Sequence, residues 1–126
     1  MSETLDQILD EISGDLQGCL HTSVIDGATG LALAASSRSD GSAGADAFHN
    51  DLYRLGRQAV DALPGDRQLE EVVLTSQKAT FVSVPVDETG YIWLVVAEGA
   101  TTVGFIQAMM RKHVGRIEDG LAPLVG

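Results

Sequence analysis

The sequence contains a single cysteine and little positive charge, and both shortages exclude classes of protein. Cys19 alone cannot form an internal disulfide, which is compatible with a reducing compartment. Eight basic residues against eighteen acidic ones give a net charge of −10, and such a surface repels nucleic acid and anionic membranes. We therefore expect no nucleic-acid partner. The acidic charge serves solubility or attracts a basic partner.

Long apolar runs are also missing. The longest, residues 92–97, is far shorter than the ~20 residues that a membrane-spanning helix needs. The first residues are acidic, unlike the basic start of a secretion signal. We expect a cytoplasmic protein without membrane insertion, and a length of 126 residues predicts a single domain over residues 1–126.

Motifs for catalysis or cofactor binding are absent from the sequence. It has no glycine-rich nucleotide loop and no G-x-S-x-G serine elbow. His21, His49 and His113 lie too far apart for a metal-ligand motif. Cys19 follows the end of a predicted helix, where the helix dipole raises a thiol pKa. We expect no catalytic, cofactor-binding or metal-binding residues, and hence no enzyme.

Three short runs rich in β-branched and aromatic residues predict the centre of the fold. They cover residues 71–76, 79–86 and 91–97 and are separated by a two-residue and a four-residue turn. Connections this short join antiparallel neighbours, so the runs form a meander. The third run is apolar almost throughout, which predicts a central strand covered on both faces.

The remaining periodic segments predict three helices and a hairpin. Thr4 and Gln7 fit a capping box at the start of the first helix, and Asp46 is the expected N-cap of the second. Residues 37–45 are a low-complexity stretch, expected to be a surface loop. The result is an α+β domain with element order α-β-β-α-β-β-β-α. The segments are helix 5–17, strands 20–25 and 31–36, helix 47–63 and helix 103–121.

The apolar arc of helix 47–63 is wider than one sheet requires. One stripe is expected to lie on the sheet, and a flank of Tyr53, Gly56 and Val60, with His49, extends it on one side. This flank contacts a loop of the same chain or packs against a second copy of the helix, where Gly56 permits close approach. The stripe comprises Phe48, Leu52, Leu55, Ala59, Ala62 and Leu63.

The order of elements and several local patterns resemble the roadblock/dynein light-chain family. The resemblance begins with the first helix and residues 18–26, which follow it. Asp26 and Gly30 together resemble the family's hairpin signature. Residues 73–75 and 81–86 resemble its third and fourth strands. Residues 94–97 and the helix that contains Gly104 resemble the C-terminal part of the family's domain.

This resemblance implies a five-stranded antiparallel sheet in the order 2-1-5-4-3. Helices 1 and 3 cover one face and helix 2 the other, which makes the acidic first helix a neighbour of the basic third. It also implies a homodimer in which strand 3 pairs with its copy and the second helices lie side by side. Glu70 and Glu71 depart from this pattern, since they repel across a two-fold axis. The candidate interface residues are Tyr53, Gly56, Val60, Val72, Val73, Leu74 and Thr75.

The resemblance further implies a non-enzymatic module that regulates or scaffolds a small Ras-like GTPase, in a GTPase-activating or effector role. The outer face of the second helix offers the candidate partner-binding residues Asn50, Arg54, Arg57 and Asp61. Arg54 and Arg57 are either solvated surface or arginine fingers. One alternative is a nucleotide-independent adapter. Another is a small-ligand sensor whose pocket is left by the small side chains of Ala32, Ala34 and Ala35.

Overall fold

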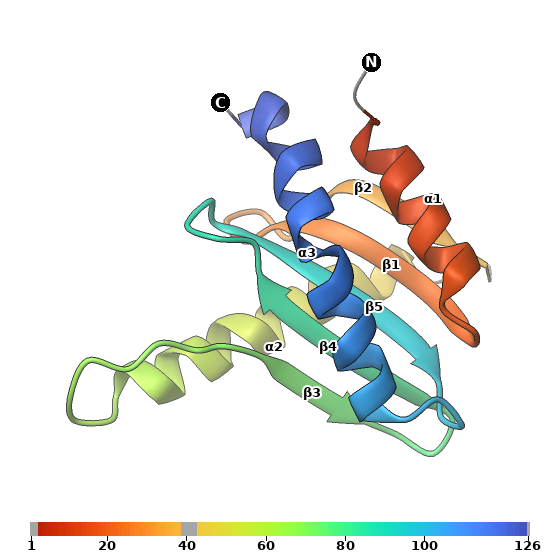
Figure 1. Ribbon diagram of the computed structural model, residues 1–126. Helices are drawn as coiled ribbons and strands as arrows, with labels where there is room; N and C mark the ends of the chain where they lie inside the picture. Colours follow the sequence, from red (N-terminus) through yellow and green to blue (C-terminus); the bar gives the residue numbers. More distant parts are fainter. Residues whose placement is uncertain (1–2, 39–42, 126) are drawn as a thin grey trace.

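Five strands and three helices follow one another along the chain in the predicted order (Figure 1). The computed structural model describes residues 3–38 and 43–125. None of the helices in these two ranges is long and apolar enough to cross a membrane. The elements are α1 (Leu5–Asp15), β1 (Cys19–Asp26), β2 (Ala32–Ser37), α2 (Ala43–Asp61), β3 (Val72–Thr75), β4 (Ala79–Pro85), β5 (Tyr91–Glu98) and α3 (Val103–Val125).

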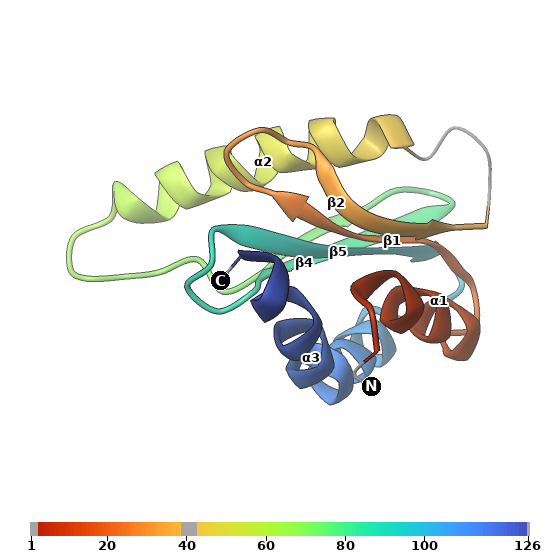
Figure 2. The ribbon, with the colours of Figure 1, turned by 90° about the horizontal axis from the view of Figure 1, so that it is seen from above.

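The strands form one antiparallel sheet in the order β2-β1-β5-β4-β3, as the family resemblance implies. Figure 2 shows α2 on one face of the sheet and both α1 and α3 on the other. The meander β3-β4-β5 and the hairpin β1-β2 are joined by the pairing of β1 with β5. The two short edge strands, β2 and β3, therefore lie at opposite ends of the sheet.

Strand β5 is the central strand and is covered on both faces, as its apolar run predicts. Residues 92–97 are all buried. Alternation along the strand turns Leu94 and Val96 toward α2, and Trp93 and Val95 toward α1 and α3. This double coverage divides the apolar interior into two clusters, one on each side of the sheet.

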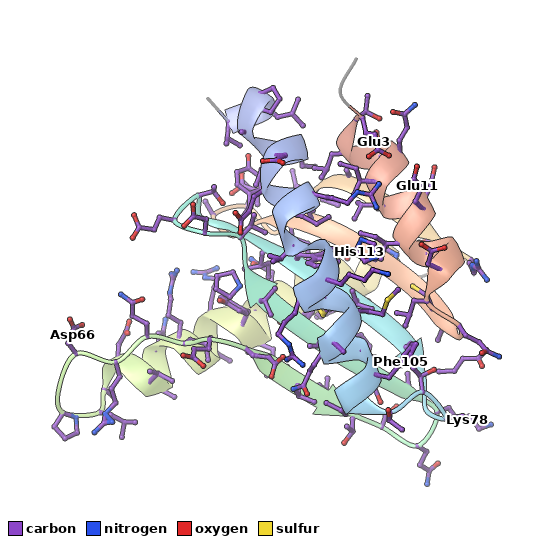
Figure 3. The ribbon with its side chains drawn as sticks, in the orientation of Figure 1. Glu3, Glu11, Asp66, Lys78, Phe105 and His113 are labelled. Atoms are coloured by element: carbon purple, nitrogen blue, oxygen red, sulfur yellow. The ribbon has the colours of Figure 1, made fainter. Side chains whose placement is uncertain are left out.

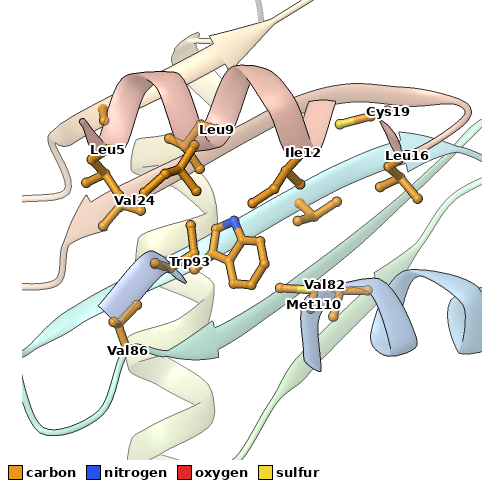
Figure 4. Packing of buried hydrophobic residues seen from close by; sticks show 14 of the residues in the cluster. Leu5, Leu9, Ile12, Leu16, Cys19, Val24, Val82, Val86, Trp93 and Met110 are labelled. Atoms are coloured by element: carbon orange, nitrogen blue, oxygen red, sulfur yellow. The ribbon is translucent and has the colours of Figure 1, made fainter. Parts of the chain in front are cut away.

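Trp93 lies in the middle of the larger cluster, beneath α1 and α3 (Figure 4). Its indole Nε1 donates to Thr22 Oγ1 at 2.8 Å, and this hydroxyl donates to the Leu94 carbonyl at 2.9 Å. The indole is thus fully buried with its polar atom satisfied. Leu9 and Ile12 of α1 belong to the same cluster, and burying each such side chain contributes ~2 kcal/mol.

The first helix begins as its sequence predicts. The Gln7 backbone N–H donates to Thr4 Oγ1 at 3.2 Å, and the Thr4 N–H donates to Gln7 Oε1 at 2.9 Å, which completes the capping box. The chain leaves α1 through Gly18, whose φ of +86° suits glycine. Arg116 of α3 pairs with Glu3 and Glu11, so the acidic first helix and the basic third helix are neighbours, as implied.

Most boundaries differ from the predicted ones by one or two residues, but the start of α2 and the end of α3 differ by more. It begins at Ala43, so the expectation that Asp46 is the N-cap was wrong, and Asp46 lies inside the first turn. Part of the predicted 37–45 loop belongs instead to β2 and α2, and residues 39–42 lie outside the described part. Helix α3 runs to Val125, beyond the predicted residue 121, and contains Pro123 near its end.

Candidate partner-binding site on helix α2

A buried polar network fixes the first half of α2 on the sheet. The ring of His21, on β1, donates from Nε2 to Asp46 Oδ1 at 2.8 Å, and its Nδ1 lies 2.5 Å from Ser37 Oγ. Ser23 donates to the same Asp46 oxygen at 2.7 Å. Asp46 is 4% exposed, and its carboxylate lies in the first turn of the helix, where the helix dipole favours negative charge. The network joins β1, β2 and α2.

A second contact of this kind lies one turn further along. His49 Nε2 is 2.6 Å from Ser83 Oγ of β4, and its ring stacks on Phe81 with centroids 5.8 Å apart. Burial lowers the pKa of His49, and the nearby carboxylate of Asp46 opposes this shift. The imidazole is therefore held in its neutral form beneath the helix.

These contacts turn α2 so that its apolar stripe faces outward. The expectation that this stripe lies on the sheet was wrong: Phe48 is 78% exposed and Leu55 61% exposed. The buried side is formed by polar and aromatic residues, Asp46, His49 and Tyr53 among them. Hydrophobic periodicity found both apolar parts of the helix but placed the wrong one on the sheet. The flank with His49 and Tyr53 faces the sheet instead, because partners on β1 and β4 satisfy the polar side chains beside it.

An apolar patch results beside the edge strand β3. Ala45, Phe48 and Leu52 of α2 line a shallow cavity of about 230 Å³ together with Leu74 of β3. Leu55 lies on the same stripe of α2, three residues beyond Leu52. We call Phe48, Leu52, Leu55 and Leu74 the apolar patch. Exposed apolar groups gathered in this way are typical of interaction surfaces.

The predicted interface residues of α2 take different positions. Tyr53 is 5% exposed and packs among apolar residues between α2 and the sheet, where burial raises the pKa of its phenol. Gly56 faces Val72 and Leu69 of the same chain, which a Cβ there would meet at 3.6 and 3.7 Å. Val60 is half-buried. The flank that contains these residues is thus the side nearer the sheet.

The predicted interface residues of β3 lie at the edge of the sheet. Val73, Leu74 and Thr75 are exposed, whereas Val72 is half-buried. Among the described residues, β3 pairs only with β4. Its outer backbone groups are therefore available to another strand.

All four predicted partner-binding residues line one pocket of about 350 Å³, which we call the arginine pocket. Arg54, Arg57 and Asp61 are exposed on α2. Asn50 is buried, and its Nδ2 donates to the Gly27 carbonyl at 3.3 Å. The expectation that Asn50 lies on the outer face of the helix was therefore wrong, whereas Arg54, Arg57 and Asp61 do lie there.

The far wall of the arginine pocket was not predicted. It comes from the turn between β4 and β5, which contributes Asp87, Glu88 and Gly90, and from Tyr91 at the start of β5. No local signal links these residues to α2, because only the sheet order brings the turn next to the helix. The pocket joins two cations to several carboxylates, which suits ion pairs and hydrogen bonds with a polar partner surface.

The described residues offer little for metal binding or thiol chemistry. Within residues 3–38 and 43–125, no group of three or more His, Cys, Asp or Glu side chains is placed to hold a metal ion. Cys19 is buried, and burial raises the pKa of its thiol, as expected from the sequence, although desolvation rather than the helix dipole is the main cause.

The sequence matches no protein-family model and no curated protein. The structure, however, is similar to solved ones. The Roadblock/LC7 domain from Streptomyces avermitilis gives a TM-score of 0.82 at 17% identity, over 95% of this chain and 99% of that one. MglB from Myxococcus xanthus gives 0.79 at 10% identity, over 94% and 95%. The gliding protein MglB from Thermus thermophilus gives 0.79 at 12% identity, over 94% and 89%.

These similarities extend over nearly the whole chain. At such low identities they concern the fold and not the residues of a site. The chain has the roadblock/LC7 fold.

Proposed function

We propose that this chain is a non-enzymatic, homodimeric binding module that regulates or scaffolds a small Ras-like GTPase in the cytoplasm. One observation carries the proposal: Asn50, Arg54, Arg57 and Asp61 converge in one pocket, and the same helix carries the apolar patch. Helix α2 therefore offers an apolar surface and a charged one. In this module the Ser37–His21–Asp46 chain anchors α2 on the sheet through its hydrogen bonds.

The apolar patch is the proposed contact with the second copy. Phe48 and Leu55 are exposed, and Leu74 extends their apolar surface onto β3, as is typical of an interaction surface. Pairing of β3 with its copy would satisfy the free edge of the sheet. In this arrangement the outward stripe replaces Tyr53 and Gly56 as the helical part of the interface, while the β3 residues keep their predicted role.

The arginine pocket is the proposed contact with the GTPase. Arg54 and Arg57 project from α2 next to Asp61 and the carboxylates of the β4–β5 turn, and such mixed charge favours specificity over raw affinity. The module could alter the switch segments of the GTPase or supply an arginine to the phosphate charge that develops during hydrolysis.

Affinity capture tests the proposed partner. The tagged protein is incubated with a lysate of its source organism in excess GDP or a non-hydrolysable GTP analogue, and bound proteins are identified by mass spectrometry. We expect a small GTPase enriched in one nucleotide state. Equal capture in both states, or a partner that is not a GTPase, would favour the adapter alternative.

A matched pair of variants tests the site. The double variant Arg54→Gln/Arg57→Gln should reduce affinity for the GTPase by roughly tenfold, because two charged contacts are lost. The control variant Lys78→Gln/Lys112→Gln makes the same change of charge at exposed residues away from the pocket, and should bind like the wild type.

Single-turnover GTP hydrolysis with the variant Arg54→Ala/Arg57→Ala distinguishes an arginine finger from an effect on the switch segments of the GTPase. Full stimulation by this variant would exclude an arginine finger.

A further inference from the structure

A second and larger groove lies on the opposite face of the molecule, between α3 and the segment that precedes β3. It has a volume of about 660 Å³. One stripe of α3 lines it through Gln107, Met110, Arg111 and Val114, whose spacing places them on one side of the helix. Residues 68–71 form the other wall, and Val84 of β4 lies at the bottom. Figure 3 views the molecule from the side of α3.

The bottom of the groove is apolar and incompletely covered. Met110 belongs to the core beneath α3, and Val84 and Val114 are half-buried residues packed against that core. Leu69 adds a further half-buried apolar side chain from the opposite wall. An apolar side chain of a partner would remove this surface from water, which favours binding.

The rim of the groove is acidic. Asp66 and Glu70 are exposed, and Glu71 is half-buried, with its Oε2 accepting from Gln107 Nε2 at 2.8 Å. Arg111 is the single cation among the residues that line the groove. The contact between Glu71 and Gln107 joins the two walls, so the groove is already formed without a partner.

We propose that this groove docks a segment of a partner protein in which an apolar side chain is flanked by lysine or arginine. The apolar side chain would lie on Val84 and Val114, and the basic groups would pair with the carboxylates of the rim. Charge complementarity selects this chemistry, because three carboxylates face one guanidinium in a chain of net charge −10. Electrostatic attraction would also speed the encounter.

The groove is separate from the proposed GTPase contact. Helices α3 and α2 lie on opposite faces of the sheet (Figure 2). Gln68, Leu69 and Pro85 line both the groove and the arginine pocket, and they form the wall between them. Substitutions elsewhere in the groove leave this shared wall unchanged.

Selection from a library of random peptides displayed on phage identifies the preferred occupant. We expect the selected peptides to share an apolar residue next to lysine or arginine. The synthetic consensus peptide should shift the methyl resonance of Met110, and its affinity should fall as salt is added. An acidic consensus, no consensus, or an unchanged Met110 resonance would overturn the proposal.

Matched variants separate a specific site from general attraction to an acidic protein. Asp66→Asn/Glu70→Gln should weaken binding of the consensus peptide roughly fivefold. Asp6→Asn/Asp10→Asn removes the same charge from exposed residues of α1 and should have little effect. An equal loss in both variants would show non-specific attraction and contradict the docking site.

Val114→Gln tests the apolar bottom and should also weaken the peptide, while Phe105→Gln, a change at a 49% exposed residue of the same helix, should not. If Val114→Gln instead changes the mass of the free protein in light scattering, the groove is a contact between copies and the proposal fails. GTPase capture by the groove variants stays as in wild type, so this test is independent of the proposed function.

Discussion

At the scale of single residues, the buried polar side chains of α2 determine how this helix lies on the sheet. Asp46 accepts hydrogen bonds from His21 and Ser23 in a place that water does not reach. A buried carboxylate is costly unless it is paired in this way, and a buried donor without an acceptor is costly as well. The three residues therefore depend on one another.

Replacement of Asp46 should expose this dependence. Asp46→Ala leaves the His21 and Ser23 donors without their acceptor, so we expect the free energy of unfolding to fall by about 2–3 kcal/mol in urea titrations. Asp51→Ala on the exposed side of the same helix is the control and should be nearly neutral. Similar losses in the two variants would show that the network contributes no stability.

His49 makes stability depend on pH. Burial lowers its pKa in the folded state below the ~6.5 of an unfolded chain, so the unfolded chain binds more protons below that pH. Stability present near neutral pH is therefore lost as the pH falls through the window below ~6.5. The pKa of His113 is lowered as well, mainly by burial and then by the positive charges of Arg116 and Lys112.

Chemical unfolding at a series of pH values between about 7 and about 5 measures this effect. We expect a smaller loss of stability across this range in His49→Gln than in the wild type, because the variant has no imidazole to protonate at this position. The stability of the double variant His49→Gln/His113→Gln should depend on pH even less. A His49→Gln profile parallel to that of the wild type would contradict the assignment.

At the scale of elements, the orientation of α2 decides which surface is free. With Asp46 and His49 toward the sheet, Phe48 and Leu55 must point away from it, since they lie on the opposite side of the helix. The outward stripe lies beside β3, which is an edge strand. A helix and an edge strand thus form one continuous surface for a second copy.

Leu55→Glu should break the proposed dimer, because an unpaired charge would enter an apolar contact at a cost of several kcal/mol. Light scattering should give the monomer mass. Leu55 is 61% exposed in the single chain, so the fold itself should persist, as circular dichroism can confirm. Phe105→Glu places the same charge on α3 and should leave the dimer intact. A Leu55→Glu variant of dimer mass would show that the interface lies elsewhere.

At the scale of the whole molecule, the sheet separates two surfaces of different chemistry. The α2 face carries the apolar patch and the arginine pocket, and the α3 face carries the acidic groove. If the patch is a dimer contact, folding and association are linked, and the stability of the protein depends on its concentration.

Thermal unfolding over a range of protein concentrations tests this link. The Tm of the wild type should rise with concentration, because mass action favours the dimer, whereas that of Leu55→Glu should not change. A wild-type Tm that is independent of concentration would mean that the folded chain is stable as a monomer.

Local sequence determined the elements of this protein. The capping box at Thr4, the glycine after α1, and the short turns within the meander act over a few residues, so they can be identified without the fold. The apolar run in residues 92–97 likewise identified the central strand, because a strand buried on both faces has no polar alternation. The sheet order came from the resemblance to a family, and not from these local signals.

Tertiary structure alone decided the orientation of α2 and the composition of its pocket. The pattern of the helix predicts that Phe48 and Leu55 lie on the sheet and that Asp46 is the N-cap. The partners that reverse this assignment, His21 and Ser23, lie more than twenty residues away in the sequence. The β4–β5 turn reaches the arginine pocket through the sheet order in the same way. Hydrogen bonds between distant residues depend on the folded geometry, and periodicity within one helix contains no information about them.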